Sequence, residues 1–77
     1  MTDVRIPKMG MSTVEVDIVA VHVTPGDRVE SDSIVVEVQS EKANFEVEAG
    51  TAGTVKEVLV QEGDEARVGD VIVRVEE

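Results

Sequence analysis

The chain contains no cysteine, no tryptophan and no tyrosine, and its single aromatic residue is Phe45. Without cysteine it can form no disulfide, no thiolate metal site and no thiol nucleophile. Small secreted domains usually depend on disulfides for their stability, so we expect this one in a reducing interior. Because aromatic side chains are almost absent, the core has to be built from aliphatic residues.

Basic residues are also scarce, since seven Lys and Arg stand against seventeen Asp and Glu and the formal net charge is −10. A nucleic-acid-binding surface needs a basic face, so this function is excluded. No stretch is long enough to span a bilayer, and the first residues lack the apolar core of a signal peptide, so no membrane partner is expected. The acidity has two compatible interpretations: solubility, and electrostatic steering toward basic surfaces of partner proteins.

Valine dominates what is present, with eighteen Val and four Ile against one Leu. Branching at Cβ restricts the side-chain torsion and suits a pleated sheet better than a helix. The length of 77 residues is enough for one core, so residues 1–77 are expected to form a single domain. The composition therefore predicts an all-β fold, with one helical turn at most, over Asp64–Arg67.

An internal repeat organises the chain, because two halves match without a gap at an offset of 37 residues, as from Gly26 to Gly63. Neither half is large enough to bury its own apolar face, so the halves must pack on each other. The repeat therefore predicts a sandwich with quasi-twofold symmetry. Three pairs of segments match: Val21–Val23 with Val58–Val60, Gly26–Asp27 with Gly63–Asp64, and Ile34–Val38 with Val71–Val75.

Each half has the pattern of a strand, a Gly-Asp turn, a short polar connection and a second strand. At Ile18–Val19 the alternation of apolar and polar residues changes parity, which predicts a β-bulge or a strand that changes sheets. After Val38 the strand pattern resumes at residues 44–48, whereas the equivalent strand of the second half ends near the C-terminus. The first half thus has a hairpin that the second lacks, with Glu41 and Lys42 at its exposed tip.

Lys42 is one of three lysines, together with Lys8 and Lys56. An exposed lysine is protonated at neutral pH and is a poor nucleophile by itself, but an enzyme can join its amine to an activated acid. Such an enzyme must reach the amine in a defined geometry. A tight hairpin tip provides that geometry and a mid-strand lysine such as Lys56 does not, so position favours Lys42 as a modification site.

The segment Val38-Gln39-Ser40-Glu41-Lys42-Ala43 resembles the lipoylation motif of lipoyl domains from 2-oxo acid dehydrogenase acyltransferases. The resemblance covers essentially the whole chain, since residues 6–12 look like the family's opening strand and loop, and residues 25–27 and 50–53 coincide with its turns. The motif departs from the common pattern at Gln39 and Glu41, where the family usually has an acidic residue and an aspartate. These departures concern the choice of partner more than the modification.

The resemblance implies a flattened barrel-sandwich hybrid of two four-stranded antiparallel sheets, with lipoate joined by an amide to Lys42 between Glu41 and Ala43. The lipoyl group would carry acyl groups and reducing equivalents between a thiamine-diphosphate-dependent 2-oxo acid decarboxylase, an acyltransferase catalytic domain and dihydrolipoyl dehydrogenase. It further implies a lipoate-attaching enzyme, a bacterial cytoplasmic or mitochondrial matrix location, a monomeric isolated domain and no catalytic residue of its own. Which 2-oxo acid or acetoin-type complex the domain serves stays open, as does whether it is free-standing.

A second candidate site is the loop of Met9, Gly10, Met11 and Ser12, which follows the first expected strand. In the family that this chain resembles, the loop lies beside the lysine turn and helps the decarboxylase to recognise the domain. Packing beneath the turn explains the two methionines equally well. Both interpretations stand.

Three other functions compete with the lipoyl interpretation. A biotin carrier domain usually has Met on both sides of its lysine, where this chain has Glu41 and Ala43. The lipoylated carrier of glycine cleavage is longer and has helical elements that are missing here. An unmodified interaction module stays possible, whereas an enzyme is disfavoured because no nucleophile–base pair is present. His22 is expected on the surface, and the acidic clusters do not fit a calcium loop, so no metal site is predicted.

Overall fold

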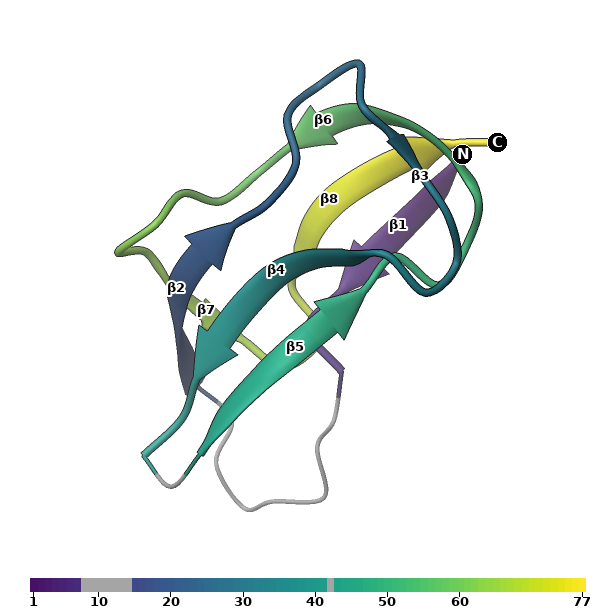
Figure 1. Ribbon diagram of the computed structural model, residues 1–77. Coiled ribbons are helices and arrows are strands. Elements are labelled where there is room, and N and C mark those ends of the chain that lie inside the picture. The colour runs from purple at the N-terminus through teal and green to yellow at the C-terminus, as the bar shows by residue number, and fades with distance from the viewer. Residues whose placement is uncertain (8–14, 42) are drawn as a thin grey trace.

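The computed structural model describes residues 1–7, 15–41 and 43–77, and every regular element in these ranges is a β-strand. The strands form two four-stranded antiparallel sheets, in the orders β1-β8-β6-β3 and β5-β4-β2-β7 (Figure 1). The predicted fold class is confirmed. In these ranges no helix is long and apolar enough to cross a membrane. The strands are β1 (Thr2–Arg5), β2 (Glu15–Val21), β3 (Arg28–Val29), β4 (Ile34–Gln39), β5 (Asn44–Glu48), β6 (Gly53–Val58), β7 (Glu65–Arg67) and β8 (Val71–Glu76).

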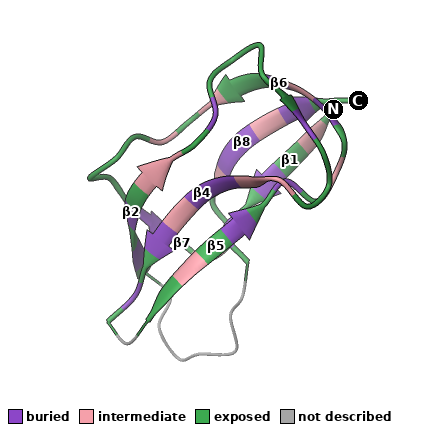
Figure 2. Ribbon diagram, viewed as in Figure 1, coloured by how far each residue is buried: buried purple, intermediate pink, exposed green. Residues whose placement is uncertain are grey.

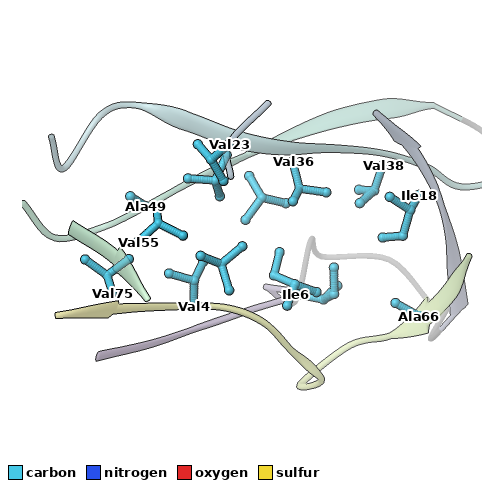
Figure 3. Close-up of a cluster of buried hydrophobic side chains, with 14 of the residues drawn as sticks. Val4, Ile6, Ile18, Val23, Val36, Val38, Ala49, Val55, Ala66 and Val75 are labelled. Carbon is cyan, nitrogen blue, oxygen red and sulfur yellow. The ribbon is translucent and has the colours of Figure 1, made fainter. Parts of the chain in front are cut away.

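The hydrophobic core lies between the two sheets, whose inward side chains meet in Figure 3. Strands β4 and β8 are interior strands of their sheets, and Figure 2 shows buried segments on both, with the same burial pattern along the two strands. Each enclosed Val or Ile contributes about 1.5–3 kcal/mol relative to an exposed one. The repeat places the same positions of both strands in the core, and six residues have no exposed surface: Val35, Val36, Val38, Ile72, Val73 and Val75.

Backbone hydrogen bonds repeat with the offset found in the sequence. The amide of Gly26 donates to the carbonyl of Val55, and the amide of Gly63 donates to the carbonyl of Ile18, each at 2.8 Å. Both glycines have positive φ, 99° and 94°, in the left-handed region that glycine adopts without a steric cost. Each half thus pins its Gly-Asp turn to a strand of the other half, which confirms the quasi-twofold arrangement.

The parity change at Ile18–Val19 is a β-bulge. The register of β2 against β4 shifts between Ile18 and Ala20, and the register of β6 against β8 shifts at the equivalent place, between Val55 and Glu57. A bulge bends a strand and increases its twist, which lets each sheet curl around the shared core. The predicted bulge is therefore one of a symmetric pair.

The helical turn allowed over Asp64–Arg67 is wrong, because Glu65–Arg67 forms strand β7. Ala66 lies opposite Val16 of β2 and is buried against the core, while its neighbours Glu65 and Arg67 are exposed. Local helix propensity is a weak preference that pairing with a neighbouring strand overrides. The short segment becomes an edge strand because β2 offers it a hydrogen-bonding partner.

Candidate attachment site at the β4–β5 hairpin

The hairpin predicted after Val38 is formed by β4 and β5, which begins at Asn44 as expected. The pairing continues to Gln39 opposite Asn44, and beyond it the amide of Ser40 donates to the carbonyl of Ala43 at 2.8 Å. Only positions 41 and 42 separate these two bonded residues. Glu41 and Ala43 are exposed.

Lys42 itself lies outside the described residues, so its role as an attachment point stays a prediction. The same holds for the loop residues Met9, Gly10, Met11 and Ser12. What the structure describes is the frame that holds position 42: the two strands, Ser40 and Glu41 before it, and Ala43 after it. Figure 1 shows that this hairpin projects from one end of the molecule, opposite the end where both termini lie.

The hairpin stands on strands that are anchored in the core. Val36 and Val38 have no exposed surface, and their cross-strand partners are Val47, which is buried, and Phe45, which packs against the core. Side chains in such a close-packed interior do not move far without a cost in contacts. The core therefore holds the base of the hairpin firmly, while Glu41 and Ala43 beyond it are exposed.

Ser40 is the buried polar residue of the site, with 7% of its surface exposed. Its hydroxyl accepts a hydrogen bond from the amide of Ala43 at 3.3 Å and donates one to the carbonyl of Ala43 at 3.2 Å. Sequence reasoning did not assign a role to this residue. The available signal was a small hydroxyl residue two positions before Lys42, within the segment that resembles the lipoylation motif.

Charge around the hairpin is mostly acidic. A shallow hollow of about 270 Å³ lies beside the tip, and Glu37 and Glu46 face each other across the two strands there. His22 is exposed, as predicted, and its Nε2 lies 3.2 Å from Oε1 of Glu37. The hollow is lined by Val19, Glu37, Val38, Asn44, Phe45 and Glu46.

Lys56, which its mid-strand position disfavoured as a modification site, lies on a different strand from the β4–β5 hairpin. Lys56 lies within β6, and its ammonium group is 3.4 Å from a carboxylate oxygen of Glu76 on the neighbouring strand β8. It lies where the register of β6 against β8 shifts, between Val55 and Glu57. In the part of the chain that the structure describes, no three His, Asp or Glu side chains gather as a possible metal site.

Comparison with known proteins gives consistent results. A family model described as "Biotin-requiring enzyme" (biotin/lipoyl) matches residues 2–75. The acetyltransferase components of the pyruvate dehydrogenase complex from Staphylococcus aureus and Staphylococcus epidermidis, named as dihydrolipoyllysine-residue proteins, are each 43% identical to this chain over 72 residues. Those residues are 94% of this chain and 17% of each relative, so the chain spans about a sixth of their length.

A solved structure agrees with the fold. The solution structure of the lipoyl domain of the 2-oxoglutarate dehydrogenase complex from Azotobacter vinelandii superposes with a TM-score of 0.78 at 26% sequence identity. The superposition covers 100% of this chain and 98% of that domain. A match so nearly complete in both directions means that neither domain has a large element that the other lacks.

Proposed function

The chain belongs to the biotinyl/lipoyl family, as a lipoyl domain of the kind found in 2-oxo acid dehydrogenase acyltransferases, and we propose that it carries lipoate on Lys42. The observation that supports this most is the closure of the β4–β5 hairpin between Ser40 and Ala43, with exposed residues on either side of position 42. A lysine in such a short connection is accessible to a modifying enzyme and is held at a defined place.

The residues of the site fit an amide-linked lipoyl group. Attachment requires an accessible amine, and both neighbours of position 42, Glu41 and Ala43, are exposed. The group would supply a dithiolane able to accept an acyl group and electrons, with thiamine-diphosphate decarboxylase, acyltransferase and dihydrolipoyl dehydrogenase sites as partners. The protein's own contribution is to hold the attachment point on rigid strands and away from its body, so that a tethered group visits separate sites at high effective concentration.

The test is modification by purified attaching enzymes. The wild-type domain is incubated with a lipoate ligase and, separately, with a biotin ligase, and the products are analysed by intact mass and peptide mapping. We expect lipoylation on Lys42, loss of the adduct in Lys42→Arg and full modification of Lys56→Arg, which removes a lysine from the middle of β6. Labelling by the biotin ligase alone, or an adduct on Lys56, would refute the proposal.

The cargo is proposed to be the acetyl group of a pyruvate dehydrogenase complex. The support is the 43% identity to acetyltransferase components of that complex, against 26% for the domain from a 2-oxoglutarate complex. Those relatives are bacterial, which favours a cytoplasmic location. Reductive acylation of the lipoylated domain should then be faster with a pyruvate decarboxylase component than with a 2-oxoglutarate, branched-chain or acetoin-specific one. A preference for any of the others would reassign the complex.

A further inference from the structure

We propose that Ser40 is a positioning residue for the modification, because its hydroxyl holds closed the two-residue connection that contains Lys42. The inference rests on the proposed function and names the residue by which this chain presents its lysine to the attaching enzyme. Ser40 is placed directly after β4, at the point where the ladder of β4 and β5 ends.

The Ser40 hydroxyl takes the place of a backbone carbonyl as a hydrogen-bond acceptor at the end of the β4–β5 ladder. In an antiparallel hydrogen-bonded pair, each residue normally donates its amide to the other's carbonyl. At this pair the amide of Ser40 donates to the carbonyl of Ala43 at 2.8 Å, whereas the amide of Ala43 donates to the Ser40 hydroxyl at 3.3 Å. The same hydroxyl donates to the Ala43 carbonyl at 3.2 Å, so one side chain engages both backbone groups of Ala43.

These bonds are not part of the framework that the two halves share. Four other turns are each closed by a side chain that accepts a hydrogen bond from the backbone amide three residues before it. These four bonds form two pairs related by the repeat. Asp27 and Asp64 accept from Thr24 and Gln61, and Ser33 and Asp70 accept from Glu30 and Arg67. Ser40 has no such counterpart, because the equivalent position of the second half is Glu77, which has no hydroxyl group. Its bonds therefore serve the lysine turn and not the fold in general.

Loss of the Ser40 hydroxyl should change how Lys42 is presented to the attaching enzyme more than it changes the stability of the fold. Without it, a larger share of the molecules has the connection open, and the attaching enzyme binds only the closed share. An affinity measured over both states falls in proportion to the competent fraction, while the rate within the bound complex is unaffected. A single neutral hydrogen bond is worth about a fivefold change in such an equilibrium. The signature is a raised KM for the domain at nearly constant kcat.

The experiment compares three variants with the wild-type domain: Ser40→Ala, Ser40→Thr and Ser33→Ala. Ser33 is the matched control, because it lies directly before β4 and its hydroxyl also accepts a backbone hydrogen bond, from Glu30 at 2.9 Å. The kcat and KM for lipoylation by a lipoate ligase are measured by intact mass, and the melting temperature is measured for each variant. We expect KM to rise by up to about fivefold in Ser40→Ala only, with recovery in Ser40→Thr.

Each possible result bears on one of the two proposals. Equal KM values for Ser40→Ala and wild type would overturn the positioning role, and so would an equal rise in Ser40→Ala and Ser33→Ala, which would assign the loss to general stability. Failure of Ser40→Thr to recover would also contradict it, since the hydroxyl would be present without effect. A wild-type domain that takes no lipoyl group would refute the proposed function, and this inference with it.

Discussion

At one end of the molecule the chain passes from β4 into β5 through residues 40–43, and at the other end β8 finishes beside the start of β1 (Figure 1). The strand pairing at the two ends is equivalent under the repeat. Val38 lies opposite Phe45 at the hairpin end as Val75 lies opposite Thr2 at the terminal end. At the terminal end the Met1 amino group is 3.8 Å from the Glu77 side-chain carboxylate.

The outward-facing charges differ between these equivalent positions. At the hairpin end Glu37 lies opposite Glu46, whereas at the terminal end Arg74 lies opposite Asp3 at 3.3 Å. Arg74 also contacts Glu57 at 3.0 Å. Within the described ranges Glu46 has no ion-pair partner. The same strand arrangement therefore carries paired opposite charges at the terminal end and acidic side chains at the end with the candidate attachment site. Stability of the fold alone does not explain the acidic residues at the hairpin end.

The largest effect is expected from exchanging the two ends. A circular permutant would join residue 77 to residue 1 through a short glycine linker and open the chain between Glu41 and Lys42. The strands should still pair, because residues 1 and 77 already lie together. Lipoylation should fall by about 100-fold or more, since Lys42 would no longer be held in a hairpin. A control permutant with the same join, opened between Glu62 and Gly63, keeps the hairpin and should be modified; equal modification of both would contradict the comparison.

A smaller effect is expected from Gly53→Ala in β6. The repeat makes Gly53 equivalent to Val16 of β2, so this substitution tests why β6 has a glycine where β2 has a valine. A Cβ at Gly53 would overlap the Glu76 carbonyl oxygen and approach a Val75 methyl to 2.9 Å, so β8 would have to move away. Chemical denaturation should show a loss of about 2 kcal/mol in the free energy of unfolding.

The matched control for this substitution is Gly63→Ala. That position has positive φ but no atom within 4 Å of an added Cβ, so only backbone strain of about 1 kcal/mol is expected. If Gly63→Ala destabilised the domain as much as Gly53→Ala, close packing at the terminal end would not be the reason for its glycine.

The smallest effect is expected from Glu46→Lys, which would give the hairpin end the opposite-charge pair that the terminal end has. A cross-strand pair with Glu37 should raise the free energy of unfolding by about 0.5 kcal/mol at low salt, and the gain should shrink as salt is added. Thermal unfolding at two salt concentrations measures it. Arg74→Glu, which places like charges opposite each other at the terminal end, should shift stability the other way. A gain that does not depend on salt would mean that charge is not its origin.

Much of this architecture followed from local patterns. The valine-rich repeat predicted β4 and β8 and their burial, the parity change predicted the bulge in β2, and the strand pattern after Val38 located the β4–β5 hairpin. The short strands β3 and β7 were not predicted, because two or three residues carry no recognisable period. They exist through pairing with β6 and β2, which lie far from them in sequence.

The sequence by itself determined that Lys42 falls between two strands of one hairpin, because alternation and turn chemistry act over a few neighbouring residues. Only the tertiary structure decided which hydroxyl closes that hairpin and at which glycine the backbone of β8 approaches too closely for a Cβ atom. Those two facts depend on where the backbones of separate strands approach each other. Such approaches are set by the packing of both sheets around one core, so they cannot be predicted from the pattern of neighbouring residues in the sequence.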